Sequence, residues 1–402
     1  MLSALIIAVA AVTGAYLAWS KRTARSARWQ ATVTPLASIM GSGFLVSAPL
    51  LSGVGGKFAV VYMAGLLAVA YLLGSAIRFN IRYFEPIETD GHGSVQNVAF
   101  LSRIALTGAY FISVTYYLQL LAAFLLNAFG VDDPQLAHWI CSALLVSIGG
   151  LGMWHGLGVL ERLEKYVVAF NLGMIVALLV GLAIYNGLLL ESGHWALPNL
   201  PAKLDLTDLR IVLGLLIVVQ GFETSRYLGA EHPADIRIPT MRSAQLISSA
   251  IYLLFIGLAT VLFAPGLGSD VTAIITMTAP VAAILPLLLS IVAMGSQFSA
   301  AAADTAGAGG LIEEISHRDL PDRYGFALIL FVTLGITWET DVNQIIAYAS
   351  RAFALYYMFQ CIVAALVAWR TNGLAWRRAW LVLFALSALV SLAVFGLGVP
   401  AE

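Results

Sequence analysis

The sequence predicts an all-α polytopic membrane protein, and three observations support that fold class. Of its 402 residues, 60% are hydrophobic and 11% are charged, with a mean hydropathy of +0.89. Soluble domains carry about 25% charged residues, so this composition cannot cover a folded body in water. Apolar runs long enough to cross a bilayer as helices recur along the chain, and two of them are interrupted by glycine near their middle. The expected partner is the lipid bilayer, and nucleic acid is excluded.

About 12 transmembrane helices are expected, because a helix needs roughly 20 apolar residues to cross the hydrocarbon. The first six apolar runs cover residues 2–19, 32–52, 57–79, 101–129, 135–154 and 164–185. The second six cover residues 207–229, 240–264, 280–306, 324–338, 342–369 and 376–398. Most of the connecting loops are short, so most of the chain is predicted to lie in the membrane.

The basic residues predict the orientation of these helices. With the N-terminus outside, Lys57, Lys203 and Arg210 lie outside, Arg351 lies within a run, and the remaining lysines and arginines lie at cytoplasmic ends. That distribution follows the positive-inside rule. Basic residues follow the first run rather than precede it, which is the reverse of a secretory signal peptide. We therefore expect a multi-pass protein of the cell inner (plasma) membrane with its N-terminus outside.

The second run contains Gly41-Ser42-Gly43 in the middle of its membrane crossing. Two glycines around a serine weaken a helix where lost backbone hydrogen bonds are costliest. Small residues in a membrane helix are also typical of close helix packing, so both interpretations stand for this motif alone. A second interruption elsewhere in the chain favours the broken helix.

The seventh run contains Gln220-Gly221-Phe222-Glu223 at mid-depth. A carboxylate inside the bilayer is costly and marks a functional candidate; a structural Glu223 bonded to neighbouring unwound backbone is the alternative. The two interruptions are five runs apart. Two glycine-interrupted helices at corresponding positions of two five-helix halves indicate a 5+5 inverted-repeat core, with broken first and sixth core helices, as in secondary transporters.

The expected organisation has five parts. Residues 1–29 form an accessory helix and a basic cytoplasmic loop, and residues 30–185 form the first five-helix repeat. Residues 186–206 form an extracellular linker, which leads into the second repeat over residues 207–370. Residues 371–402 add an accessory C-terminal helix.

Several of these motifs occur in the same order in a known family. Gly221-Phe222-Glu223, with the connector from Ala230 to Pro239, resembles the sixth core helix and following loop of the amino acid–polyamine–organocation (APC) superfamily. Gly41-Ser42-Gly43-Phe44 is similar to the break in that family's first core helix, and the stretches Gly156 to Lys165 and His317 to Pro321 are similar to two of its loops. The resemblance implies a leucine-transporter-type fold and an ion-coupled symporter or exchanger of an amino acid or related small organic solute, working by alternating access.

The resemblance also implies where the solute binds. By analogy, the backbone amides of Ser42, Gly43 and Phe44 meet the solute carboxylate, and carbonyl groups around Ile39, Gln220 and Glu223 meet its amino group. In the fourth run, Tyr116 and Tyr117 point in different directions, so one of them can face the site. The full set of expected substrate-binding residues is Ile39, Gly41, Ser42, Gly43, Phe44, Tyr116, Gln220, Gly221, Phe222 and Glu223.

A sodium ion is the one bound group that the resemblance suggests, since in this fold it can sit between the first and eighth core helices. Ser296 and Ser299 offer hydroxyl groups, and Ala37 and Met40 offer carbonyl groups. Oxygen ligands are what a hard cation requires. Close packing of small residues is the competing interpretation of the same positions. No other cofactor is expected.

Three charged residues inside runs are candidates for coupling: Glu223, Asp304 and Arg351. Asp304 is interpreted as a cation ligand, a proton acceptor or a solvated interfacial charge. Arg351 lies about ten residues inside the eleventh run, some 15 Å along a helix, and is expected to pair with an acid, most centrally Glu223. That pair would be a gate, a switchable ion pair or a static one; alternatively, Arg351 binds a substrate carboxylate.

Other functions are weighed against transport. The chain places an extra helix before the core and one after it, an arrangement nearer to sodium/solute symporters, so a symporter for a solute other than an amino acid is one alternative. A transporter-like sensor that binds solute without turnover is another. An enzyme is not expected, because the sequence contains no HExxH, GxSxG, P-loop or clustered His/Asp motif. The sequence does not determine the coupling ion or the oligomeric state.

Overall fold

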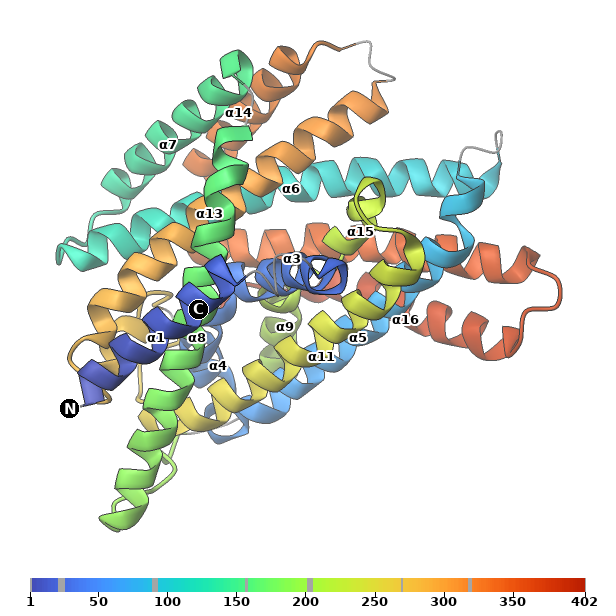
Figure 1. The fold of residues 1–402 in the computed structure, drawn as a ribbon. Helices are drawn as coiled ribbons and strands as arrows, with labels where there is room; N and C mark the ends of the chain where they lie inside the picture. Colours follow the sequence, from blue (N-terminus) through green and yellow to red (C-terminus); the bar gives the residue numbers. More distant parts are fainter. Residues whose placement is uncertain are drawn as a thin grey trace.

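The computed structural model describes residues 2–20, 26–88, 93–155, 158–200, 205–268, 270–316 and 320–401, and its regular structure there is helical (Figure 1). The first half of the chain forms α1 (Leu2–Trp19), α3 (Ala27–Ser42), α4 (Phe44–Gly55), α5 (Ala59–Tyr83), α6 (Ser94–Ala128), α7 (Pro134–His155) and α8 (Gly158–Glu191). The second half forms α9 (Leu206–Gly214), the 3-10 turn η3 (Leu216–Val219), α10 (Thr224–Tyr227), η4 (Leu228–Ala230), α11 (Ala234–Ala259), α12 (Ile274–Thr278), α13 (Leu285–Ile315), α14 (Asp322–Glu339), α15 (Val342–Arg370) and α16 (Arg377–Leu397). Shorter 3-10 turns lie at Gly56–Phe58 (η1), Glu85–Ile87 (η2) and Thr260–Leu262 (η5).

Each expected apolar run overlaps a helix or a pair of helices in this structure. Within the described residues, nine helical stretches are long and apolar enough to cross a membrane. The count of twelve crossings, the 5+5 division and the five-part organisation remain predictions. Several helices extend well beyond their apolar run; α6 begins seven residues before its run, at Ser94, and α13 continues to Ile315. An apolar run indicates only the part of a helix that can lie in lipid. The backbone hydrogen bonds of the helix can continue beyond that part.

Polar side chains at the helix starts explain why several helices begin where they do. The Ser26 hydroxyl accepts the Trp29 N–H at 3.2 Å at the start of α3. The Asp341 carboxylate accepts the Gln344 N–H at 2.8 Å at the start of α15, where the two side chains form a reciprocal capping box. Such caps satisfy N–H groups that have no partner within the helix.

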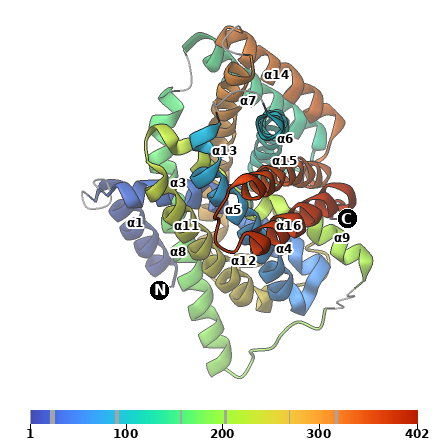
Figure 2. The same cartoon turned by 90° about the vertical axis from the view of Figure 1, so that its right-hand side faces the viewer.

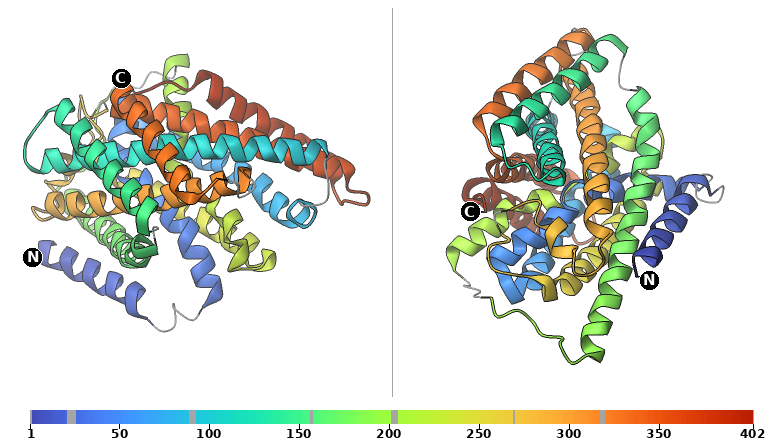
Figure 3. Two further views of the ribbon diagram at one scale, coloured as in Figure 1. Left: turned by 90° about the horizontal axis from the view of Figure 1, so that it is seen from above. Right: turned by 90° about the vertical axis from the view of Figure 1, so that its left-hand side faces the viewer.

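The long helix α6 lies in the centre and packs along both α13 and α15 (Figure 1). It is the most buried of the nine membrane-length stretches, and α1 and α16 are the least buried. Helices α7 and α14 pack against each other at one edge of the bundle (Figure 2). Helix α1 lies on the outside, against α8 (Figure 3).

The contact between α1 and α8 is unusually close because small residues face each other. The buried face of α1 repeats every four residues, at Ile6, Ala10, Gly14 and Ala18. A Cβ atom placed on Gly173 of α8 would lie 2.7 Å from the Ala10 carbonyl oxygen and 2.8 Å from the Gly14 nitrogen. Close approach of this kind replaces hydrophobic driving force as the source of helix association in lipid. Helix α1 is therefore fixed along α8.

Helical structure is interrupted at both positions where the glycines predicted it. Gly43 separates α3 from α4. In the second half, η3 ends at Val219, and regular helix resumes at Thr224. Between them, Gly221 has a φ of +115°, a conformation that glycine adopts readily and residues with a Cβ atom do not.

Candidate functional site

The two interruptions pack against each other, backbone to backbone. A Cβ atom on Gly43 would lie 2.2 Å from the Val218 Cα atom, and one on Gly221 would lie 2.7 Å from the Ser38 carbonyl carbon. From α11, the Tyr252 hydroxyl reaches the carbonyl oxygens of both Ile39, at 3.0 Å, and Val218. One buried hydroxyl thus contacts a main-chain oxygen of each broken helix.

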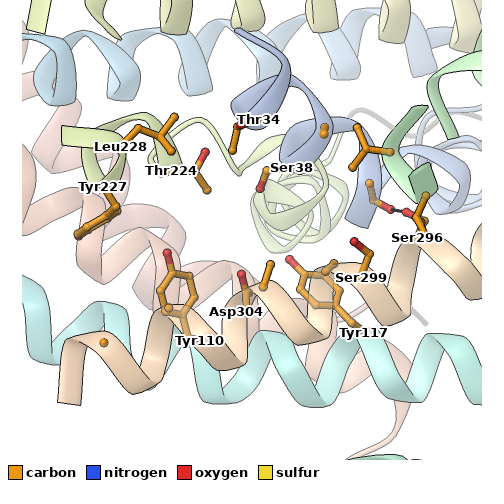
Figure 4. Close-up of a pocket in the computed structure, with 18 of the residues that line it drawn as sticks. Thr34, Ser38, Tyr110, Tyr117, Thr224, Tyr227, Leu228, Ser296, Ser299 and Asp304 are labelled. Atoms are coloured by element: carbon orange, nitrogen blue, oxygen red, sulfur yellow. Dashed lines mark hydrogen bonds between the residues drawn. The ribbon is translucent and has the colours of Figure 1, made fainter. Parts of the chain in front are cut away.

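Beside this contact lies a cavity of about 360 Å³, lined by residues of α3, α6, α8, α10, η4 and α13. Figure 4 shows Ser38 and Thr224, from the two broken helices, facing Tyr110, Asp304 and Tyr117 across the space. Tyr110 and Tyr117 come from α6 and are seven residues apart, which places them on one helix face. The cavity is therefore built where both broken helices meet the central helix α6.

The wall of the cavity includes part of the predicted residue set. Gly41, Ala37, Ser296, Ser299 and Asp304 line it. Gly41 belongs to the first break, and the other four are part of the set expected to hold a cation or to couple transport; Met40, Glu223 and Arg351 of that set are not on the wall.

Most of the expected substrate-binding residues lie beside the cavity rather than on its wall, and their role in binding stays a prediction. The Phe44 ring packs on Phe255, with ring centroids 4.3 Å apart, and the Phe222 ring stacks on Tyr357 at 5.1 Å. Ile39 and Gln220 are buried, as is Met40, one of the residues expected to hold a cation. The cause is the direct packing of the two breaks, which points their backbones at each other. Ser42 ends α3, and its side chain lies outside the described residues.

The paired tyrosines differ in their relation to the cavity. Tyr117 lines the cavity, whereas the predicted Tyr116 is fully buried in the core. The Gln220 Nε2 group donates a hydrogen bond to the Tyr117 hydroxyl at 3.3 Å. The second break is thus joined to the cavity wall through Tyr117.

Glu223 holds the second break in shape. Its Oε2 atom accepts hydrogen bonds from the Gly221 N–H at 3.0 Å and from the Tyr357 hydroxyl at 2.7 Å. The side chain is 1% exposed. The structure therefore agrees with the alternative in which this carboxylate bonds to unwound backbone.

The expected ion pair between Glu223 and Arg351 is not formed between these two described residues. In the described structure, Arg351 donates from Nε to the Phe395 carbonyl oxygen at 2.7 Å, and its guanidinium lies 5.8 Å from the centre of the Phe395 ring. Phe395 belongs to the last turn of α16, where carbonyl groups lack helical partners and carry partial negative charge. Arg210 bonds the neighbouring Leu397 carbonyl at 3.1 Å. Both arginines stabilise a helix end.

The polar groups expected to hold a cation do lie together. The Ser296 hydroxyl donates to the Gly41 carbonyl oxygen at 2.6 Å, and Gln297 Nε2 donates to the same oxygen at 3.4 Å. Asn171 of α8 contributes a 3.5 Å contact to Ser296. The Gly41 carbonyl oxygen and the Ser296 hydroxyl oxygen are neutral ligands of the kind that suit a hard cation, whereas Gln297 and Asn171 direct amide N–H groups toward them. Among the described residues, no group of three or more His, Cys, Asp or Glu side chains is placed to hold a metal ion.

A charged layer, missed by the sequence analysis, lies near the end of the cavity. Arg103 of α6 pairs with Glu314 of α13 and lies 4.0 Å from Glu88. Arg226 of α10 pairs with Glu88 at 3.0 Å. Each of these charges lies beyond an apolar run or at its end, which makes it look like a solvated loop residue in the sequence. Their partners are far away along the chain.

Comparison with known proteins gives the family. A family model described as an APC superfamily transporter matches residues 21–398. The chain belongs to the APC superfamily of transporters. An uncharacterized protein from Aquifex aeolicus (strain VF5) is 41% identical over 350 residues, which cover 85% of each chain. The family resemblance drawn from the sequence is thereby confirmed.

A solved structure shows the fold that this APC-superfamily chain shares. A crystal structure of a mutant manganese transporter from Eremococcus coleocola matches with a TM-score of 0.60, at 11% sequence identity, over 92% of this chain and 87% of that one. Family and fold together support a membrane transporter, rather than an enzyme, with several membrane-spanning helices.

Some wall residues of this APC-superfamily protein were not in the predicted set. Thr34 and Ser38 continue the Gly41 face of α3 toward its N-terminus, and Tyr110 and Tyr117 share a face of α6. Their spacing was available in the sequence. The position of Thr224 was not, because it depends on how the chain turns at Gly221.

Proposed function

We propose that this protein is an ion-coupled secondary active transporter that moves an amino acid or a related small organic solute by alternating access. The observation that carries the proposal is the cavity of about 360 Å³ at the meeting of both broken helices with α6, α8 and α13. Its size suits a small organic solute, and its wall is rich in hydroxyl groups. Broken helices at a central site are the arrangement that inverted-repeat transporters use.

The extent of the cavity supports an inward-facing conformation. It runs from Gly41 and Ser296 to Glu314, one residue before the end of α13. Eighteen residues of helix are about 27 Å long. With the N-terminus outside, the positive-inside rule puts that end of α13 on the cytoplasmic side of the plasma membrane. The cavity then opens toward the cytoplasm.

Sodium is the proposed coupling ion, held where the Gly41 carbonyl and the hydroxyl groups of Ser296 and Ser299 meet. The hydrogen bond between Ser296 and Gly41 shows that two of these oxygens approach within 2.6 Å. A cation at this point would bind α3 to α13, and α3 is one of the two broken helices. Ion binding would thereby stabilise one arrangement of the solute cavity.

The proposal is tested by counterflow in proteoliposomes, with labelled leucine, alanine, lysine and glutamate and with sodium and pH gradients imposed separately. The test variant is Ser38→Trp, which places an indole ring in the cavity. Its matched control is Ser147→Trp, which places the same ring at an exposed position of α7. We expect exchange of at least one solute by the wild type and by S147W, and none by S38W.

Two results would contradict the proposal. If S38W and S147W exchange the solute at equal rates, the cavity is not the transport route. If no solute exchanges while one of them raises the unfolding temperature, the protein binds solute without turnover and is a sensor.

A further inference from the structure

Helices α5 and α11 pack side by side (Figure 1), and each carries an arginine near its predicted cytoplasmic end. Arg78 lies five residues before the end of α5, and Arg242 lies eight residues after the start of α11. Arg78 is half-buried, and Arg242 is exposed. Where the structure describes the chain, neither arginine forms an ion pair with a carboxylate.

A buried glutamine joins the two helices and fixes the position of Arg78. Gln245 of α11 donates from Nε2 to the Ala70 carbonyl oxygen of α5 at 2.9 Å, and its Oε1 atom accepts a hydrogen bond from Arg78. A Cβ atom on Gly74 would lie 2.8 Å from the Gln245 Cδ atom, so the glycine makes room for this amide. Arg242 lies one helical turn before Gln245. The two arginines therefore meet at one helix junction, within electrostatic reach of each other.

The guanidinium group of Arg78 is held in place with hydrogen-bond donors to spare. It lies over the Tyr71 ring, 4.8 Å from the ring centre, and its Nη2 group donates to the Tyr71 carbonyl oxygen at 3.3 Å. An arginine has five N–H groups, and the hydrogen bonds of Arg78 to Tyr71 and Gln245 use two of them. The remaining N–H groups can bind an anion.

A lipid phosphate is the anion that suits this position. Phosphate oxygens accept parallel hydrogen bonds from a guanidinium group, and one phosphate between two arginines offsets the repulsion of their like charges. Near the ends of membrane helices, such side chains reach the level of the lipid head groups. Leu246, one turn further into the membrane than Arg242, is 50% exposed. It offers an apolar surface to an acyl chain below the head group.

We propose that Arg78 and Arg242 bind the phosphate of an anionic glycerophospholipid in the cytoplasmic leaflet, with Gln245 as the residue that positions Arg78. Basic sites between membrane helices on the cytoplasmic side are suited to anionic head groups. A lipid with net negative charge binds better than a zwitterionic one, because a choline group adds a positive charge to a site that already has two. The bound lipid holds α5 and α11 together.

Thermal unfolding of the purified full-length chain in a neutral detergent tests this site without a transport assay. The protein is titrated with dioleoyl-phosphatidylglycerol, with dioleoyl-phosphatidylcholine as the zwitterionic probe and glycerol 1-phosphate as a soluble phosphate without acyl chains. A ligand that binds only the folded state raises the Tm. We expect phosphatidylglycerol to raise the Tm at a lower mole fraction than phosphatidylcholine, and glycerol 1-phosphate to leave the Tm unchanged.

Three variants test the residues of the site. Arg78→Gln and Arg242→Gln each remove one positive charge. One arginine near a lipid head group corresponds to about a 5-fold change in affinity, so each variant should need about 5-fold more phosphatidylglycerol for the half-maximal rise in Tm. Gln245→Leu should reduce the preference for phosphatidylglycerol over phosphatidylcholine, a ratio that looser helix packing alone would not change.

Arg323→Gln is the matched control. Arg323 is also exposed at a predicted cytoplasmic helix end, and its guanidinium group lies 4.9 Å from the centre of the Tyr324 ring. We expect this variant to respond to phosphatidylglycerol as the wild type does. If R78Q does not fold, R242Q decides the question, because Arg242 is exposed.

The assignment is overturned if phosphatidylcholine stabilises the wild type as effectively as phosphatidylglycerol. It is also overturned if R242Q and R323Q respond equally to phosphatidylglycerol, since the two arginines of the site would then be no different from any other basic residue at the membrane surface. Stabilisation by glycerol 1-phosphate equal to that by phosphatidylglycerol would show that the site binds free phosphate rather than lipid.

Discussion

Gly43 lies directly against Val218, so the two broken helices meet with no side chain of residue 43 between them. The same is true of Gly221 against Ser38. The breaks are therefore held together by contacts between main-chain atoms, and their separation is set by the glycines.

Replacement of Gly43 by alanine is expected to disrupt this contact. The added Cβ atom would lie 2.2 Å from the Val218 Cα atom, which is backbone and cannot rotate away. Overpacking of this kind costs about 1–3 kcal/mol, and thermal unfolding of the purified protein should register it as a lower Tm. Gly41→Ala is the matched control, because its nearest contact is the Ser296 Oγ atom at 3.4 Å. Equal Tm values for the two variants would show that the breaks are free to separate.

Removal of the Glu223 carboxyl group is expected to destabilise the second break. In Glu223→Ala, the Gly221 N–H and the Tyr357 hydroxyl lose their acceptor while buried. Each unsatisfied group costs about 1–3 kcal/mol. Glu223→Gln keeps an acceptor oxygen, so its Tm and uptake should stay close to wild type. Loss of uptake by E223Q at an unchanged Tm would instead show that transport needs the negative charge.

Replacement of Ser296 by alanine is expected to weaken sodium coupling. The variant loses the hydroxyl that contacts Gly41, and one lost polar contact of this kind corresponds to about a 2- to 10-fold higher sodium concentration for half-maximal uptake. Ser290→Ala on the same helix is the control, since that hydroxyl bonds the Pro286 carbonyl within α13. The cation site would be refuted if uptake did not depend on sodium. It would also be refuted if the wild type, S296A and S290A showed the same sodium dependence.

Replacement of Gly173 by leucine should push α1 away from α8. Its Cβ atom alone would lie 2.7 Å from the Ala10 carbonyl oxygen, and we expect a loss of about 1–3 kcal/mol seen as a lower Tm. Gly187→Leu, on the same helix with open space around it, should leave the Tm unchanged. If G173L is as stable as G187L, the close packing of α1 contributes nothing measurable to the fold.

The positions of the helices and of both breaks could be predicted because they depend on local properties of the sequence. Hydropathy identifies α6 and α13 as membrane helices whatever packs against them. Gly43 and Gly221 weaken a helix in any fold. The family followed from the order of such motifs. The neutral cluster around Ser296 was also within reach, because it depends on a helix pair that the resemblance names.

The detailed wall of the cavity could not be predicted in the same way, because it depends on the rotation and register of packed helices. Tyr116 and Tyr117 are identical side chains at adjacent positions. The rotation of α6 about its axis determines which of them lines the cavity. An arginine inside an apolar run is expected to pair with an acid, yet Arg351 bonds the Phe395 carbonyl group at the end of α16. A helix end is a partner that no charge pattern reveals.

The close contact between α1 and α8 also has a consequence for biosynthesis. Gly14 and Gly173 touch in the finished protein, yet about 160 residues of chain separate them. At a synthesis rate of about 5–20 residues per second, the chain between them takes roughly 8 to 32 seconds to make. During that interval Gly173 does not yet exist, so α1 cannot form its close contact. The joining of α1 to α8 therefore follows the synthesis of α3, α4, α5, α6 and α7.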